Sequence, residues 1–184
     1  MRTFIALEIP EKAKKELANI QEELKTKGIQ ARMVEAKIIH LTLSFLGEVS
    51  QNKIVSVEKI LEKIAQEISL VKLRLNKVDC FPSPLKARTI FLSLEGELGK
   101  LKALALKISK NLKKENIWFD KKPFVPHLTL GRLKSQQNLK KAIKKIKVHK
   151  IEFLGEKISL VQSILTPQGP IYKILCSFNL KKKG

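Results

Sequence analysis

The sequence predicts an α+β fold made of two related halves, each with an antiparallel sheet and helices packed outside it. Predicted strands occur in runs rather than in strict alternation with helices, which favours this class over a parallel α/β sheet. Two motifs recur at one spacing along the chain, and a helical pattern lies between them in each copy. We therefore expect the two halves to be related by a pseudo-two-fold axis.

The repeat is short, but both of its parts share one offset. Residues 4–8, Phe-Ile-Ala-Leu-Glu, correspond to residues 91–95, Phe-Leu-Ser-Leu-Glu. The tetrapeptide His-Leu-Thr-Leu occurs at 40–43 and again at 127–130, so both matches are 87 residues apart. We expect each unit to contain a strand, an amphipathic helix, a connecting stretch and a strand that bears the tetrapeptide.

Helices are expected where apolar residues recur at helical spacing. The first helix ends before Gly28, a candidate C-terminal cap, and the second follows Ser50, a candidate N-terminal cap. The fourth follows Ser135 in the same manner. The four apolar stripes are Leu17, Ile20 and Leu24; Ile54, Val57, Leu61, Ile64 and Ile68; Leu101, Leu104, Ile108 and Leu112; and Leu139, Ile143 and Ile146.

Alternating or β-branched segments predict five further strands, at residues 70–78, 88–94, 151–154, 157–165 and 171–180. Seven residues mark the turns: Pro82, Pro84, Pro123, Pro126, Pro167, Gly169 and Pro170. The tail at 181–184 is expected to fray.

We expect one domain over residues 1–184, because no segment is long enough to be a linker. Its two lobes, at 1–87 and 88–184, are expected to interleave. Cys80 and Cys176 are isolated, which predicts reduced thiols and a cytoplasmic protein. No stretch approaches the roughly 20 apolar residues of a membrane span, and Glu8 and Pro10 break the apolar run at the N-terminus.

The charge balance predicts a polyanionic partner. The chain has 37 Lys and Arg against 17 Asp and Glu, a formal net charge of +20. Residues 1–92 carry 16 basic and 11 acidic side chains, whereas residues 93–184 carry 21 and 6. A solvated lysine-rich surface is the alternative interpretation, although such surfaces usually pair Lys with abundant Glu.

The tetrapeptides carry the candidate chemistry. Because successive side chains of a strand point to opposite faces, His127 and Thr129 share one face, and the imidazole and hydroxyl lie about 7 Å apart. In the first copy we expect His40, Thr42 and Ser44 on this polar face. The opposite, buried face is expected to carry Leu41, Leu43 and Phe45.

Two imidazoles that meet across a pseudo-two-fold axis favour acid and base catalysis on a phosphodiester. With an ordinary pKa of about 6.5, one histidine can be neutral while the other is protonated. Each role contributes about 10² to 10⁴ in rate, and the threonine hydroxyls can donate to the phosphate oxygens. A two-histidine metal site is the competing hypothesis, but no Asp, Glu or Cys on the motif faces completes a ligand set. His149 has no counterpart in the repeat and is expected at the surface.

The stretches 40–47, His-Leu-Thr-Leu-Ser-Phe-Leu-Gly, and 124–132, Phe-Val-Pro-His-Leu-Thr-Leu-Gly-Arg, resemble the paired motifs of the two-histidine phosphoesterase superfamily. Residues 2–8 are similar to the first strand of its RNA 2',3'-cyclic phosphodiesterase branch, also known as RNA 2'-5' ligase, and residues 88–92 match in position. The resemblance implies a bilobal arrangement with a central basic cleft.

The resemblance also implies roles: His40 as proton donor to the leaving 3' oxygen, His127 as base on water, and Thr42 and Thr129 as phosphate ligands. The product is then a 2'-phosphate, and a 5'-hydroxyl in place of water gives a 2'-5' linkage without ATP. The implied partner is RNA with a 2',3'-cyclic phosphate end, with tRNA fragments as one candidate. No cofactor, metal or membrane contact is expected, and the chain is expected to be a monomer.

Four further residues are candidate substrate ligands. Regular alternation would place Arg132 on the face opposite His127, so Arg132 reaches the site only if a bulge intervenes. Ser44 is a candidate because it is expected on the polar face with His40 and Thr42. Phe45 and Phe124, together with Trp118, are candidates to stack on an RNA base, with core packing as the alternative role.

Two other functions stay open at this point. One is a basic RNA-binding module without turnover, which would lose no activity on substitution of His40. The other is the same chemistry on a small cyclic nucleotide or an ADP-ribose cyclic phosphate, and unrelated RNA would not inhibit that reaction by competition.

Overall fold

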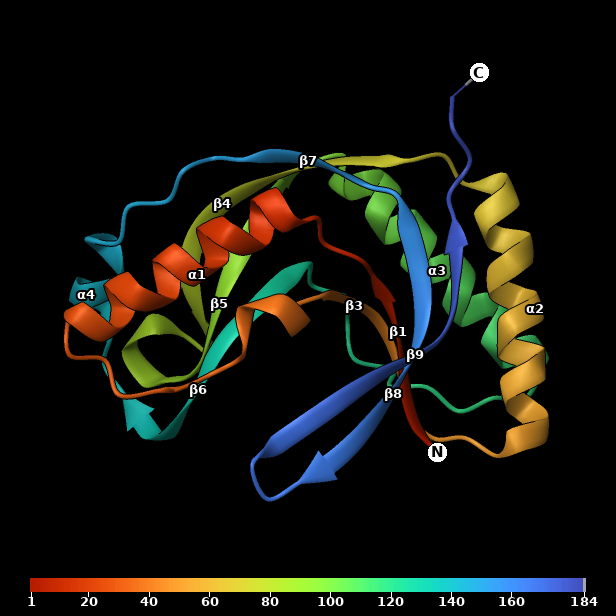
Figure 1. Ribbon diagram of the computed structural model, residues 1–184, viewed down its shortest axis with the longest axis horizontal. Coiled ribbons are helices and arrows are strands. Elements are labelled where there is room, and N and C mark those ends of the chain that lie inside the picture. Colours follow the sequence, from red (N-terminus) through yellow and green to blue (C-terminus); the bar gives the residue numbers. More distant parts are fainter. Residues whose placement is uncertain (184) are drawn as a thin grey trace.

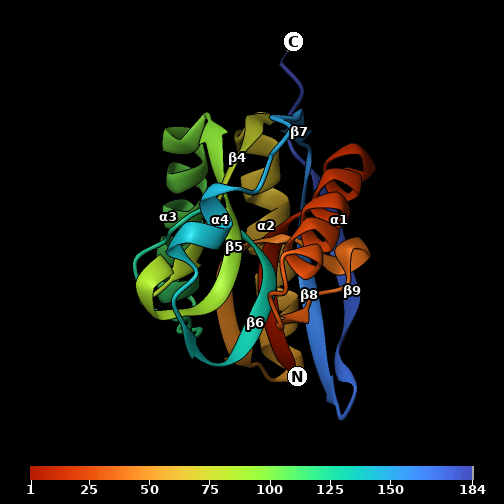
Figure 2. The same cartoon turned by 90° about the vertical axis from the view of Figure 1, so that its left-hand side faces the viewer.

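The computed structural model describes residues 1–183 and confirms the α+β class. Figures 1 and 2 show two antiparallel sheets with helices on their outer faces. The first sheet has the strand order β3(Leu41–Glu48), β1(Arg2–Leu7), β8(Lys157–Thr166) and β9(Gly169–Asn179). The second has the order β2(Arg32–Met33), β6(His127–Gln137), β5(Ala87–Gly96), β4(Val71–Phe81) and β7(Glu152–Gly155).

The pseudo-two-fold relationship is visible in the pairing of the strands. In the first sheet β1 lies between β3 and β8, and in the second β5 lies between β6 and β4. Phe4 in β1 and Phe91 in β5 are the residues that the 87-residue offset relates. β8 pairs with β1 and β9 pairs with β8, whereas β4 and β7 belong to the sheet of β5, so a division at residue 87 does not coincide with the boundary between the sheets.

The helices are exchanged between the sheets. α1(Glu11–Thr26) follows β1 but lies over the second sheet, where the Gln21 amide donates to the carbonyl oxygens of Val34 and Leu130 at 2.6 and 2.9 Å (Figure 1). α3(Leu98–Lys114) follows β5 but packs on the first sheet beside α2(Gln51–Glu67). α4(Lys140–Lys144) lies at the edge of the second sheet. Each lobe therefore needs a helix from the other unit.

One continuous core joins both sheets. Ile5 and Leu160 of the first sheet and Leu92 and Leu128 of the second are fully buried in the same apolar cluster. The stripes predicted for the first three helices face this cluster, and Ile68, which follows the end of α2, is partly buried against it. Because the two lobes share buried surface, neither sheet has a core of its own.

The ends of the helices agree in part with the predictions. Gly28 has φ +77°, and its N–H donates to Lys25 while the N–H of Ile29 donates to Leu24, which is a Schellman cap. Ser50 is the N-cap residue of α2, but its hydroxyl donates to the Asn52 side chain and not to the helix backbone.

Three details of the predicted elements are wrong. Ser135 lies within β6, because that strand continues to Gln137, and the helix that follows is short and begins after Leu139. Gly169 and Pro170 lie in β9 and pair with Thr166 and Leu165 across the hairpin. The tail does not begin at residue 181, since Lys181 pairs with the backbone of Ile68 and Leu70; Gly184 lies outside the described residues.

Candidate active site

The two histidines are held by the same backbone contact. Nδ1 of His40 lies 3.0 Å from the carbonyl oxygen of Ile38, and Nδ1 of His127 lies 2.7 Å from that of Val125. A carbonyl oxygen only accepts, so Nδ1 carries the proton in both rings. In each neutral imidazole Nε2 is then the basic atom. The segment before each strand, which in the first copy includes the short 3-10 helix Ala36–Ile38, therefore leaves Nε2 as the basic atom in both copies.

Aromatic rings form the walls around both imidazoles. His40 stacks on Phe4 with ring centroids 4.4 Å apart, and the edge of Tyr172 lies 5.2 Å away. Phe81 and Phe91 stack on each other, and the ring of His127 lies edge-on to both, with centroids 5.1 and 5.6 Å away. Phe4 and Phe91 are related by the same offset as the histidines, so each copy of the repeat supplies the imidazole and a ring that restricts it.

The two threonines differ in their contacts. The hydroxyl of Thr42 lies 3.0 Å from Nε2 of His40. Thr129 is partly exposed, and no hydrogen bond joins its hydroxyl to another group within residues 1–183. The hydroxyl of Thr129 is therefore free to donate to a phosphate oxygen, whereas that of Thr42 is shared with the imidazole.

A bulge of the same kind interrupts both histidine strands. The pairing of β3 with β1 skips Leu43, and the pairing of β6 with β5 skips Leu130, which is the corresponding residue. An extra residue reverses the alternation of all that follow it. Arg132 is thereby placed on the His127 side, where its charge lowers the pKa of that imidazole, and it donates to Thr89 at 3.3 Å.

The bulge at Leu43 of β3 reverses the predicted faces of Ser44 and Phe45. Ser44 borders the cleft, but its hydroxyl is buried and has no hydrogen-bond partner within residues 1–183. Phe45 is 51 % exposed and lies 6.2 Å from Phe4, on the polar side with His40. The prediction assumed regular alternation, which the bulge at Leu43 removes.

Burial lowers the pKa of both histidines below the ordinary 6.5. For His40 burial is the main cause, the Ile38 carbonyl opposes it, and the charges of Lys14 and His127 add to it. For His127 burial again dominates, the Val125 carbonyl opposes it, and Arg132 adds to the lowering. The free site therefore favours neutral imidazoles, and a bound anion would favour the charged form.

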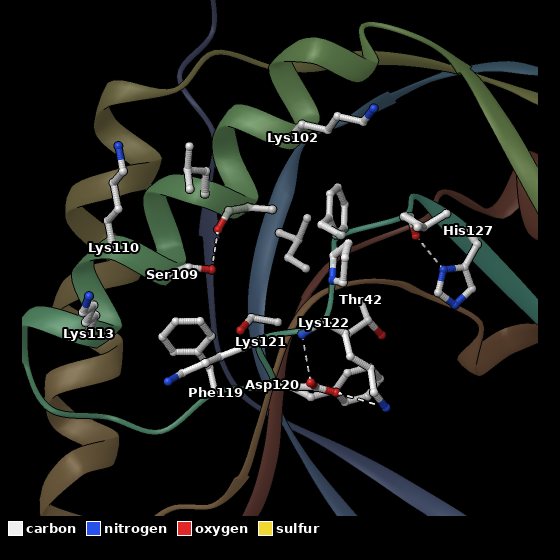
Figure 3. A pocket seen from close by; sticks show the side chains of 18 of the residues that line it. Thr42, Lys102, Ser109, Lys110, Lys113, Phe119, Asp120, Lys121, Lys122 and His127 are labelled. Carbon is white, nitrogen blue, oxygen red and sulfur yellow. Dashed lines mark hydrogen bonds and ion pairs between the residues drawn. The ribbon is translucent and has the colours of Figure 1, made fainter.

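A cavity of about 840 Å³ extends from Thr42 and His127 toward α3 (Figure 3). Phe45, Phe119 and Phe124 line it, and Phe119 and Phe124 also pack against the core. Five lysines also line it: Lys102, Lys110, Lys113, Lys121 and Lys122. A smaller cavity of about 180 Å³ adjoins His40 and is lined in part by Lys14, Lys37 and Tyr172. The cleft is therefore basic on both sides of the histidines.

The remaining candidates lie outside the cleft. His149 is exposed, and its N–H groups bond to the buried carboxylate of Glu16. Trp118 is also exposed, which excludes the core role for it. Cys80 and Cys176 are free, and burial raises the pKa of Cys80 to about 11.

Residues 1–183 contain neither a cluster of metal ligands nor a membrane-spanning helix. No group of three or more His, Cys, Asp and Glu side chains there is arranged to hold a metal ion. No helix in the same range is long and apolar enough to cross a membrane.

The arrangement of these residues agrees with what comparison with known proteins shows. The family model for LigT-like phosphoesterases matches residues 7–91 and 93–172, which is most of the chain. The chain belongs to this family. It is a member of the two-histidine phosphoesterase superfamily, and the predicted phosphoesterase class is confirmed.

Relatives of this LigT-like phosphoesterase align over nearly their whole length. An RNA 2',3'-cyclic phosphodiesterase of Methanocaldococcus jannaschii is 36 % identical, with 95 % of this chain and 98 % of that protein covered. One of Thermotoga maritima is 34 % identical, with 97 % and 96 % covered. The crystal structure of TT0787 of Thermus thermophilus superposes with a TM-score of 0.85 at 27 % identity over the full length of both chains. Escherichia coli LigT complexed with 3'-AMP has the same fold, with a TM-score of 0.77 at 22 % identity and 98 % of each chain covered.

Some residues of this LigT-like phosphoesterase site were not predicted from the sequence. The rings of Phe4, Phe81 and Tyr172 contact the histidines. Only Phe4 carried a signal, because it matches Phe91 in the repeat. The contacts of the other two depend on strands β4 and β9, whose place beside the histidines is set by the tertiary fold.

Proposed function

We propose that the chain hydrolyses 2',3'-cyclic phosphate ends of RNA to 2'-phosphomonoesters without a metal ion. The observation that carries this proposal is the matched pair of imidazoles, each with Nδ1 bonded to a carbonyl oxygen, so that Nε2 is the atom that can exchange a proton; Nε2 of His40 also contacts the Thr42 hydroxyl. Relatives that are 34 and 36 % identical are named RNA 2',3'-cyclic phosphodiesterases, which supports RNA as the substrate. The net charge of +20 supports it as well.

The chemistry requires one imidazole in each protonation state. Nε2 of His127 takes a proton from water, and the water oxygen attacks phosphorus. The bond from phosphorus to O3' breaks, and the Nε2 proton of His40 passes to O3'. The product is a ribose with a free 3'-hydroxyl and a 2'-phosphate. The anionic substrate counteracts the effect of burial on His40, because a negative charge nearby favours the imidazolium.

Neighbouring side chains support this transfer. The hydroxyls of Thr42 and Thr129 donate to the non-bridging phosphate oxygens, where charge is redistributed in the transition state. Arg132, placed on this side by the bulge, adds a positive charge to the phosphate site. Phe45 and Phe124 offer ring faces to the terminal base.

The same groups support attack by a second nucleophile, the 5'-hydroxyl of another RNA. A 5'-hydroxyl in place of water would attack the cyclic phosphate and form a 2'-5' linkage. No ATP is required. The cyclic phosphate already carries its own leaving group, O3', so no nucleotide has to activate the phosphate. Ligation is measured as a longer product when a second RNA with a 5'-hydroxyl is added.

The test is hydrolysis of an oligoribonucleotide with a terminal 2',3'-cyclic phosphate in the presence of EDTA. We expect a 2'-phosphate product, and a loss of about 10² to 10⁴ in kcat for His40→Ala and for His127→Ala. His149→Ala is the matched control, since this exposed histidine lies outside the cleft and should retain turnover.

Two outcomes would contradict the proposal. A folded wild-type protein that opens no cyclic end over a broad pH range is not this enzyme, and retained RNA affinity would then indicate a binding module. Activity that disappears in EDTA and returns with a divalent cation would replace the two-histidine mechanism by a metal-dependent one.

A further inference from the structure

One face of α3 forms a wall of the large cavity. Its cavity-lining residues follow helical spacing and therefore share one side of the helix: Lys102, Ala105, Leu106, Ser109, Lys110 and Lys113. The core face of α3 is a different one, made by residues such as Leu101 and Ile108. Figure 3 shows this side of α3 facing the same cavity as Thr42 and His127. The helix thus has one face for the core and another for the cleft.

Four of the five lysines of this cavity lack counter-charges. Lys102, Lys110, Lys113 and Lys121 have no carboxylate within ion-pair distance among residues 1–183. Lys122 has Asp120 at 3.7 Å, which is the only acidic side chain that the described part of the chain contributes to the cavity wall. Lys107, on another side of α3, pairs with Glu67. The cavity therefore concentrates positive charge that the protein itself leaves uncompensated.

One exposed ring, that of Phe45, and two partly buried rings lie among these charges. Phe45, Phe119 and Phe124 line the cavity, and Leu106 on α3 is 55 % exposed. A basic groove with aromatic rings is the arrangement that binds single-stranded nucleic acid, because bases stack on the rings while cations contact the backbone. A small cyclic nucleotide would occupy only part of it.

We propose that the RNA strand on the 5' side of the cyclic phosphate lies in this cavity and along α3. This inference rests on the proposed function and specifies the path of its substrate. Lys102 and Lys113 are eleven residues apart, about 16 Å along the helix, which exceeds the length of one nucleotide. Lys110, Lys113 and Lys121 then contact phosphates upstream of the reacting end.

A second lysine group provides a matched control. Lys140, Lys141 and Lys144 of α4 are exposed and have no carboxylate within ion-pair distance among the described residues. They border neither the cavity nor the histidines. If net charge alone attracted RNA, the α4 lysines would matter as much as those of the cavity.

The test compares the triple variant K110Q/K113Q/K121Q with K140Q/K141Q/K144Q. Hydrolysis of a ten-nucleotide RNA with a cyclic phosphate end, and of a mononucleotide 2',3'-cyclic phosphate, is measured over a range of KCl concentrations. Each phosphate contact to a single strand contributes about 0.7 to the slope of log affinity against log salt, so the cavity variant should lose about 2 from this slope. Its kcat/KM should fall at least tenfold more on the oligomer than on the mononucleotide. The α4 variant should match the wild type on both.

Binding is measured in parallel by fluorescence anisotropy with a labelled RNA that ends in a 2'-phosphate. An equal loss of slope in both variants, or none in the cavity variant, would overturn the proposed path while leaving the hydrolytic function intact. If the wild type hydrolyses neither substrate, the proposed function fails. The anisotropy of the two variants still decides whether RNA follows α3.

Discussion

Arg32 lies directly opposite Arg132 in the antiparallel pairing of β2 with β6. Both side chains are exposed, and neither has a carboxylate within ion-pair distance among residues 1–183. Like charges directly opposite each other destabilise a sheet. Because Arg132 also stands beside His127, the pair concentrates positive charge at the predicted phosphate site.

We expect Arg32→Gln to raise the free energy of unfolding by about 0.5 kcal/mol at low salt, because it removes this repulsion. At 1 M salt the gain should disappear, since screening shortens the Debye length to about 3 Å. The kcat/KM for the cyclic phosphate should fall at the same time. Thermal unfolding and initial rates measure the two effects. Arg88→Gln, an exposed arginine of β5, should leave the stability unchanged.

A second prediction concerns Ser44, whose hydroxyl is buried without a partner among residues 1–183. An unsatisfied buried hydroxyl costs about 1 to 3 kcal/mol, so Ser44→Ala should stabilise the chain or leave it unchanged. Turnover should be retained, because the bulge turns this side chain away from His40. Urea unfolding and a rate assay measure both. A loss of activity with intact folding would restore Ser44 as a substrate ligand.

The fate of Ser44 shows what the sequence could predict. The repeat predicted the histidine strands and the two-fold relationship, because hydrophobic periodicity and the spacing of the two motifs can be read directly from the sequence. The faces of residues after Leu43 and Leu130 were not predictable from alternation, since a bulge depends on how the neighbouring strand pairs. The exchange of α1 and α3 between the sheets was not predictable either. An apolar stripe shows that a helix packs against a core, but it does not show which sheet the helix covers.

Gly131 explains why the two motifs differ after the tetrapeptide. A Cβ at Gly131 would lie 2.9 Å from the Met33 sulfur and 3.1 Å from the Arg32 carbonyl oxygen. Ser44, the corresponding residue of β3, faces no such neighbour because β3 is an edge strand.

We therefore expect Gly131→Ser to displace β2 and to cost about 1 to 3 kcal/mol, which urea unfolding measures. The displaced Arg32 should also raise the KM. Gly99→Ser is the control, since a Cβ at Gly99 meets no atom within 4 Å. Equal stability of the two variants would show that β2 is not held by this close approach.

The contact between Glu16 and His149 yields a prediction on stability alone. The buried Glu16 carboxylate accepts from the backbone N–H of His149 at 2.8 Å and from its Nδ1 at 3.0 Å. Glu16→Ala removes both bonds and leaves donors unsatisfied, so we expect a loss of about 2 kcal/mol in urea unfolding. His149→Ala removes only the ring contact and should cost less. The reverse order would mean that the backbone bond contributes little.

The pH dependence of the reaction follows from the lowered pKa values of His40 and His127. In the free enzyme a lowered pKa lets His127 act as a base at lower pH, which moves the acidic limb of the kcat/KM profile below the ordinary histidine value of about 6.5. The same lowering of the pKa deprotonates His40 at lower pH, so the alkaline limb of the profile also moves to lower pH. The bound phosphate carries negative charge and raises both pKa values in the complex, so the kcat optimum should lie at higher pH than the kcat/KM optimum.

Initial rates over a broad pH range measure both profiles, and His149→Ala should reproduce them. If the kcat optimum lay at lower pH instead, the bound substrate would not be charging these imidazoles, and the proton transfers assigned to them would be wrong.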